Sequence, residues 1–316
     1  MDIYNCTSTN STETGDEFMI KISNLTKSYD GKTVLENLNC NIKTNCIYGL
    51  IGANGAGKST LLRIINDVIR RNSGSILIDD IEVENNEAVK QKLAFLPDDL
   101  FFYPNYKMLD MAKYYQAMYE KFDMEYFKEL SKLLNLNINA KVDSFSKGMK
   151  RQVALICTLA TNAEYMFFDE TFDGLDPVVR NLMKKIIAKQ MDSKLTTIIM
   201  TSHNLRELED ICDNLGLLYK GGILFESDID SLKTNMFKVQ ISLKQDFSEK
   251  DFANLEVLNF KKTGSVAQLI IKGERDEAES TLRKMNPLIL DFLPLTLEEI
   301  FIYEMEVLGY EFGQVI

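Results

Sequence analysis

From residue 18 to about residue 231, short apolar runs alternate with longer amphipathic stretches. This pattern is typical of an α/β domain, in which crossover helices join the strands. In an open parallel sheet, ligands bind beyond the carboxyl ends of the strands, so we expect functional residues directly after such runs. Four runs are followed at once by polar residues, namely Ile47–Ile51, Leu93–Leu96, Tyr165–Phe168 and Thr197–Met200.

Between Asp98 and Lys141 the sequence becomes rich in Tyr, Met, Lys and Glu, which predicts a helical subdomain over about residues 100–160. Past residue 221 the pattern changes again. Apolar and polar residues alternate over residues 237–243, as in a half-buried strand, and residues 268–271 predict another strand.

Two helices are expected in the remaining part of the chain, over residues 274–285 and 297–308. Thr296 and Glu299 fit a capping box at the start of the second helix, and Gly309 is expected to end it. We therefore predict a small α+β accessory domain over residues 235–316. Residues 1–17, rich in Ser, Thr and Asn, are expected to form a flexible tail.

Charge and cysteine content exclude several classes of protein. The chain has 36 Lys and Arg against 47 Asp and Glu, a formal net charge of −11, and an acidic chain repels nucleic acid. Its five cysteines form no Cys-x-x-Cys pair, so neither a disulfide framework nor a zinc site is expected. We find neither a signal peptide nor the roughly 20 apolar residues of a membrane span, which indicates a cytosolic protein.

A glycine-rich segment follows the first apolar run. It reads Gly-Ala-Asn-Gly-Ala-Gly-Lys-Ser over residues 52–59 and fits the phosphate-binding pattern G-x-x-x-x-G-K-[ST]. Glycines let backbone N–H groups surround phosphate oxygens, and the following helix presents its positive end to them. Lys58 is expected to reach the β- and γ-phosphates, and Ser59 to bind Mg²⁺. The nucleotide contacts predicted here are Gly52, Asn54, Gly55, Gly57, Lys58, Ser59 and Thr60.

Two acids and the single histidine follow later runs. Asp169 comes directly after Tyr165–Phe168 and is predicted to hold Mg²⁺, a hard cation that prefers oxygen ligands. Its neighbour Glu170 is expected to act in catalysis by accepting a proton from the attacking water, or by orienting it. His203 follows the last run and is the second predicted catalytic residue, in contact with the γ-phosphate or that water.

A second phosphate site is predicted where Ser146-Lys147-Gly148 opens a helix. The serine hydroxyl, the free N–H groups and the helix dipole all favour an anion there. One chain then has two phosphate-binding surfaces for one nucleotide. Head-to-tail pairing of two chains would resolve this, because Ser146 and Gly148 of each chain could complete the nucleotide site of its partner.

Taken together, these motifs resemble the nucleotide-binding subunits of ATP-binding-cassette (ABC) transporters over about residues 18–231. The resemblance implies the P-loop NTPase fold of an ABC ATPase, with Tyr29 stacked on adenine and Asp176 communicating between the two sites. Two positions differ from the usual family pattern. Lys147 replaces a signature glycine, as in some bacterial exporters of the bacitracin-resistance type. Asp98 stands where Gln is common; it is either a Mg²⁺ contact or a simple turn residue after Pro97.

The resemblance further implies a subunit that binds and hydrolyses ATP and powers transport, with export favoured. Its expected partners are a second ABC ATPase subunit, identical or a paralogue, and a separate polytopic membrane permease that holds it at the inner face of the membrane. Tyr103, Tyr106 and Met108 are candidates for docking the permease, unless they belong to the core. The alternatives are a soluble ABC-type ATPase acting on ribosomes or DNA, and a single-site kinase or GTPase.

Overall fold

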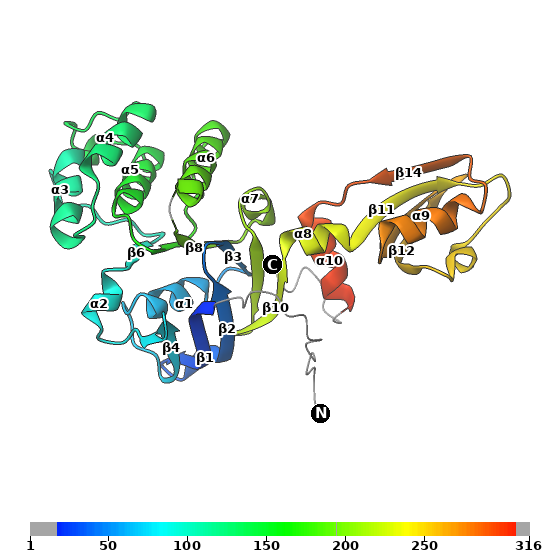
Figure 1. The fold of residues 1–316 in the computed structure, drawn as a ribbon, viewed down its shortest axis with the longest axis horizontal. Helices are drawn as coiled ribbons and strands as arrows, with labels where there is room; N and C mark the ends of the chain where they lie inside the picture. The colour runs from blue at the N-terminus through cyan, green and yellow to red at the C-terminus, as the bar shows by residue number, and fades with distance from the viewer. Residues whose placement is uncertain (1–17, 194, 308–316) are drawn as a thin grey trace.

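The structure is a computed structural model that describes residues 18–193 and 195–307. It contains three sheets, and the third, with its helices, extends away from the other two (Figure 1). The predicted tail over residues 1–17 and the predicted helix end at Gly309 lie outside the described residues.

A six-stranded sheet lies at the centre of the larger part, in the order β10-β9-β3-β8-β7-β6. All neighbouring strands in it are parallel except the edge pair β10 and β9. The strands are β3 (Ile47–Ile51), β6 (Leu93–Leu96), β7 (Tyr165–Phe168), β8 (Thr197–Ser202), β9 (Asn214–Tyr219) and β10 (Gly222–Asp228).

The four strands predicted from the apolar runs are confirmed, and β8 is two residues longer than predicted. Thr201 and Ser202 remain in this buried strand although they are polar, because their hydroxyls find partners in Asp169 and Glu207. Ile51 pairs with Ser202, so the carboxyl ends of the central strands β3 and β8 lie side by side.

An antiparallel sheet in the order β2-β1-β4-β5 faces the central sheet across helix α1 (Lys58–Ile65). Leu61, Leu62, Ile64 and Ile65 of this helix are buried in a cluster that includes residues of both sheets. The other elements here are β1 (Phe18–Tyr29), β2 (Lys32–Lys43), β4 (Ser73–Ile78), β5 (Ile81–Glu82) and helix α2 (Glu87–Lys90).

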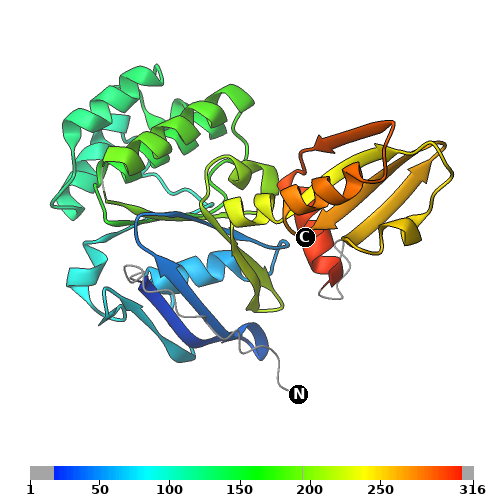
Figure 2. The same cartoon turned by 45° about the vertical axis from the view of Figure 1, so that its right-hand side comes forward.

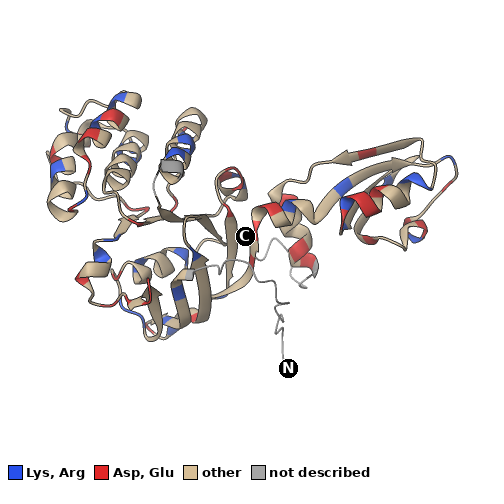
Figure 3. Ribbon diagram, viewed as in Figure 1, with Lys and Arg blue, Asp and Glu red and all other residues tan. Residues whose placement is uncertain are grey.

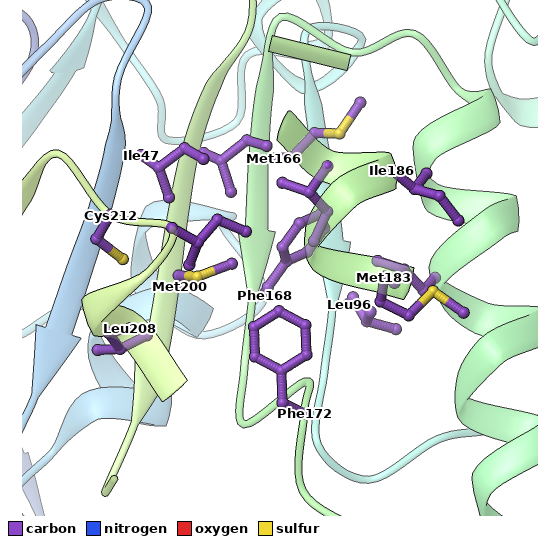
Figure 4. Close-up of a cluster of buried hydrophobic side chains, with 14 of the residues drawn as sticks. Ile47, Leu96, Met166, Phe168, Phe172, Met183, Ile186, Met200, Leu208 and Cys212 are labelled. Carbon is purple, nitrogen blue, oxygen red and sulfur yellow. The ribbon is translucent and has the colours of Figure 1, made fainter. Parts of the chain in front are cut away.

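The opposite face of the central sheet is covered by helices. They are α3 (Met108–Met118), α4 (Met124–Leu133), α5 (Lys147–Ala160), α6 (Pro177–Ser193) and α7 (Leu205–Glu209), with a 3₁₀ turn at Val142–Ser144. Figure 4 shows this core, where Phe168 of β7 and Met200 of β8 point toward Met183 of α6 and Leu208 of α7.

Of the two alternatives left open for Met108, a docking surface or the core, the structure supports the core. Met108 is completely buried, as is Ala112, and Met111 lies beside them on the same face of α3. Residues spaced by three and four positions form one stripe of a helix, and in α3 this stripe packs inward.

The third sheet has the order β12-β13-β11-β14 and is antiparallel throughout. Its strands are β11 (Met236–Ser242), β12 (Glu256–Thr263), β13 (Val266–Lys272) and β14 (Ile289–Leu293). The helices of this region are α8 (Ile229–Thr234), a 3₁₀ turn at Glu249–Phe252, α9 (Arg275–Arg283) and α10 (Leu297–Val307). One face of the sheet and α9 enclose a separate hydrophobic cluster that includes Val239, Leu269 and Leu282.

Helix α10 returns from the third sheet to the larger part of the molecule (Figure 2). Phe301 is fully buried and meets Phe225 of β10 edge to face, with 5.5 Å between the ring centroids. The predicted capping box is confirmed: Glu299 N donates to Thr296 Oγ1 at 3.2 Å, and Thr296 N donates to Glu299 Oε2 at 3.0 Å.

The cysteines of the described residues are free and buried, as predicted for core residues. Burial raises the pKa of both the Cys40 and Cys46 thiols to about 12, so they stay protonated at neutral pH. In the part of the chain that the structure describes, every helix is too short or too polar to span a lipid bilayer.

Candidate nucleotide site

The glycine-rich loop connects β3 to α1, and two of its glycines, Gly52 and Gly57, lie where a Cβ would clash. A Cβ on Gly52 would lie 2.5 Å from the carbonyl oxygen of Leu218, and Gly57 has φ of 111°. Lys58 begins α1 and is only 5% exposed. Its Nζ donates to the carbonyl oxygens of Gly52 at 2.6 Å and Ala53 at 3.3 Å. The carbonyl oxygens of the loop therefore bind the ammonium group, and an anion could bind the backbone N–H groups of the loop.

Asp169 follows β7 and is completely buried. Its Oδ1 accepts hydrogen bonds from Ser59 Oγ at 3.0 Å and Thr201 Oγ1 at 2.7 Å, whereas its buried Oδ2 has no hydrogen-bond partner among the described residues. An unpartnered carboxylate oxygen is costly to bury. A hard cation would satisfy it, and Ser59 could supply a second oxygen to the same ion, so these residues fit Mg²⁺.

Glu170 is held at both its backbone and its carboxylate. Its φ of 46° is left-handed, a conformation that costs a non-glycine residue about 1–3 kcal/mol and needs support from its surroundings. The support comes from Thr201 Oγ1, which accepts from Glu170 N at 3.0 Å, and from Arg151, whose Nη1 donates to Glu170 O at 2.9 Å. The carboxylate lies 3.4 Å from Lys58 Nζ and 2.9 Å from Nδ1 of His203.

His203 follows β8, as predicted, and is 48% exposed at its side chain. The next residue, Asn204, caps α7 by accepting from Arg206 N at 3.1 Å. Because β8 ends before His203 and α7 begins after Asn204, the imidazole lies at the carboxyl end of this central strand, next to Glu170.

A cavity of about 510 Å³ opens above these groups. Its lining comprises Val34, Asn54, Gly55, Gly57, Lys58, Ser59, Thr60, Asp98, Glu170, Asp173 and His203. The structure thus brings together most residues that the sequence assigned to nucleotide, metal and catalysis. Val34 and Asp173 were not singled out in the sequence, whereas Gly52 and Asp169 were predicted but do not belong to the lining of this cavity.

Ser146 and Gly148 do not belong to the lining of this cavity, although they lie in the described part of the chain. Ser146 caps α5 by accepting from Met149 N at 3.2 Å. A Cβ on Gly148 would lie 3.6 Å from the carbonyl oxygen of Gly174, so the start of α5 adjoins the turn that leads into α6. Lys147 Nζ lies 3.7 Å from Asp173 Oδ2 in this turn. The second predicted phosphate surface is therefore separate from the first within one chain.

Asp176 and Tyr29 also lie outside the cavity lining described above. Asp176 caps α6, where its Oδ1 accepts from the backbone N of Val178 and of Val179, each at 3.0 Å. Tyr29 ends β1, is 43% exposed, and has Lys27 Nζ 4.7 Å from its ring centroid. The ring is exposed, and its stacking on adenine, which the resemblance implies, stays a prediction.

Four residues of the site were missed by sequence reasoning: Val34, Arg151, Asp173 and Thr201. Thr201 and Arg151 hold Asp169 and Glu170 in place, and each lies many residues from them in the sequence. A threonine at the end of an apolar run, directly before Ser202 and His203, was the available signal for Thr201. An arginine among the apolar residues of α5 was a weak signal for Arg151.

A glycine loop between a parallel strand and a helix, with two acids at the end of a nearby strand, defines the P-loop nucleoside triphosphatases. Within that class, the sequence model of the family described as ABC transporter matches residues 35–173.

Relatives of this chain include several named ATP-binding proteins. ABC transporter ATP-binding protein YtrB of Bacillus subtilis (strain 168) is 31% identical over 288 residues, which cover 90% of this chain and 97% of the relative. Lantibiotic transport ATP-binding protein SrtF of Streptococcus pyogenes is 33% identical over 67% of this chain and 92% of its own length. For bacitracin transport ATP-binding protein BcrA of Bacillus licheniformis the identity is 29%, over 68% and 71%.

Solved structures agree on the fold. An ATP-binding subunit of an ABC transporter has a TM-score of 0.62 at 23% identity, over 68% of this chain and 92% of its own. A dimeric post-hydrolysis ATP-binding cassette bound to ADP and Pi has a TM-score of 0.61 at 23% identity, over 67% and 99%. The chain therefore belongs to the ABC transporter family, as one of its ATP-binding ATPase subunits.

Proposed function

We propose that this ATPase hydrolyses Mg-ATP in a head-to-tail pair with a second ABC ATPase subunit, identical or a paralogue, and drives export through a separate membrane permease. The observation that carries this proposal is the split between two surfaces. Lys58, Glu170 and His203 meet in one cavity, whereas the serine-capped start of α5 lies outside it. Export is supported by the relatives named for lantibiotic and bacitracin transport.

In this mechanism, Lys58 exchanges its loop carbonyls for the β- and γ-phosphates. Glu170, already oriented by its backbone bonds, accepts the proton of the attacking water, and His203 holds that water and the γ-phosphate in line. Asp169 and Ser59 would hold Mg²⁺, which when bound neutralises phosphate charge. Ser146 and Gly148 of the partner would close the site and exclude bulk water.

The magnesium assignment predicts a change in metal dependence for Asp169→Asn. This variant keeps the shape of the buried side chain but removes its charge, so we expect the Mg²⁺ concentration for half-maximal ATPase activity to rise at least about tenfold. Titrating Mg²⁺ at fixed ATP measures the effect. The exposed Asp210→Asn serves as control. An unchanged Mg²⁺ curve for Asp169→Asn would refute the assignment.

An aromatic cluster beside Asp98 is proposed to dock the permease. Phe101 is 71% exposed, and Tyr106 and Tyr114 are 38% exposed. Tyr103 joins them, with its ring centroid 5.0–5.2 Å from each of the other three. Exposed apolar groups of this kind mark interaction surfaces. Three residues of this cluster lie between β6 and α3, and Tyr114 lies in α3, so a partner bound here would contact the segment that carries Asp98.

Co-purification with a polytopic membrane protein, sought among the products of the neighbouring genes, tests the proposal. We expect the wild-type chain to co-purify and Phe101→Asp to lose most of the permease, because an acid cannot enter an apolar contact without desolvation. Leu288→Asp is the matched control, since Leu288 is an exposed apolar residue of the third sheet region at 61% exposure. Equal recovery of the permease with Phe101→Asp would exclude this cluster, and no recovery with any chain would argue for a soluble ATPase.

We further propose that residues 18–231 form the ATPase domain and residues 235–316 an accessory domain, with the helical subdomain at about 100–160. The separate hydrophobic cluster of the third sheet supports this division. Acidic and basic segments are interspersed over the described elements (Figure 3), and the net charge is −11. This charge supports a protein partner rather than nucleic acid. We propose that the permease holds the subunit at the cytoplasmic face of the membrane.

A further inference from the structure

Arg151 is a buried cation in the second turn of α5, and the proposed mechanism leaves it without a role. It is only 2% exposed, and burying a guanidinium group is expensive unless it is paired and hydrogen-bonded. Its ion pair in the described structure is with Asp98, where Nη2 lies 2.7 Å from Oδ1. Asp98 itself is 51% exposed at its side chain and lines the nucleotide cavity.

The same guanidinium group also contacts the backbone of both residues that it joins. Nη1 donates to Glu170 O at 2.9 Å, and Nη2 donates to Asp98 O at 3.4 Å. The planar fork of arginine reaches two such partners through separate nitrogens in fixed directions, whereas the ammonium group of lysine donates from a single nitrogen. Arg151 therefore joins the segment after β6 to the segment after β7.

Glu170 depends on this contact because its backbone is left-handed, with φ of 46°. Its N–H is held by Thr201 and its carbonyl oxygen by Arg151, so loss of either contact would free the peptide to relax. A relaxed backbone would move the carboxylate relative to Lys58 and His203, and a displacement of about 1 Å can reduce turnover by about 10².

We propose that Arg151 is a positioning residue for Glu170, and that Asp98 acts through it to set the catalytic base. Asp98 is exposed at the cavity and lies close in sequence to the proposed docking cluster. Binding of the permease or of the nucleotide can therefore change its position. Arg151 transmits that position to the backbone of Glu170. Helix α5 begins at Ser146, which we propose completes the nucleotide site of the partner. Arg151, in the same helix, therefore connects the proposed partner-facing end of α5 to Asp98 and to Glu170.

Asp98→Ala, Arg151→Lys and the double variant test the proposal, which rests on the proposed ATPase function. We expect each single variant to lower kcat about tenfold at saturating Mg-ATP, with KM for ATP changed less than about twofold. The double variant should be no slower than the slower single variant, because both changes break one contact chain. Asp99→Ala is the control, since Asp99 is the exposed acidic neighbour of Asp98.

Wild-type kcat in Asp98→Ala would overturn the proposal. This variant leaves the buried guanidinium group of Arg151 without its ion pair, so kcat is compared only for protein that remains folded. Losses that multiply to about a hundredfold in the double variant would also overturn it, since Asp98 would then act on the reaction directly. A raised KM with unchanged kcat would place Asp98 in ATP binding instead. Thermal unfolding of each variant checks the fold. Lack of ATPase activity in the wild-type chain would refute the proposed function, a result distinct from any of these.

Discussion

Replacing Glu170 by Gln is expected to slow ATP hydrolysis by at least about 10² while ATP binding is retained. The amide has the size of the carboxylate but cannot accept the proton of the attacking water. Lys58 and the glycine loop remain in place to hold the phosphates. With hydrolysis blocked, the closed ATP-bound pair should accumulate. Phosphate release measures turnover, and size-exclusion chromatography with ATP measures the dimer.

Glu164→Gln is the matched control for this experiment. Glu164 precedes β7, whereas Glu170 follows it, so the two acids lie at opposite ends of one strand. Glu164 pairs with Lys121 at the surface, 2.8 Å away, and its change should leave turnover unaffected. Hydrolysis by Glu170→Gln at the wild-type rate would rule out Glu170 as the catalytic base.

Replacing Ser146 by Phe is expected to reduce hydrolysis by at least about 10² and to leave ATP binding by a single chain nearly unchanged. Ser146 caps α5 and does not line the cavity that contains Lys58, so we expect it to act on a nucleotide bound by another chain. The bulky ring would prevent closure of the pair. Calorimetric titration with ATP and a turnover assay separate the two effects, and Ser144→Phe in the adjoining 3₁₀ turn is the control.

Complementation makes this test sharper for a homodimer. A mixture of Ser146→Phe with Lys58→Ala contains pairs in which one site has an intact loop facing an intact serine. Activity should therefore return on mixing, although neither variant hydrolyses ATP alone. If Ser146→Phe loses ATP binding as a single chain, or if mixing restores nothing while the variants still pair, the shared site is wrong.

The local elements were largely predictable. The strands that carry the site coincide with four apolar runs, because a strand buried on both faces excludes polar residues over its whole length. The capping box at Thr296 was equally readable, because both partners lie three residues apart in the chain. Phosphate-loop residues were found because the backbone conformation of the loop demands glycine at particular positions.

Contacts between distant segments were not predictable. The side of α3 that Met108 occupies depended on which neighbour packs against the helix, and the composition of the stretch alone could not decide it. Arg151 reads as a polar residue in an amphipathic helix until Asp98 and Glu170 are seen on either side of its guanidinium group. The same holds for Thr201, which links Asp169 to the backbone of Glu170.

The sequence by itself determined the type of each element, the phosphate loop and the acids and histidine that follow the strands, because these features depend on residues close together in the chain. Only the tertiary structure decided that Lys58, Glu170 and His203 share one cavity, that Ser146 does not line it and that Arg151 binds the backbone of Glu170. The physical reason is that parallel strand pairing and burial bring together residues far apart in sequence. Patterns among neighbouring residues cannot show which distant residues come into contact.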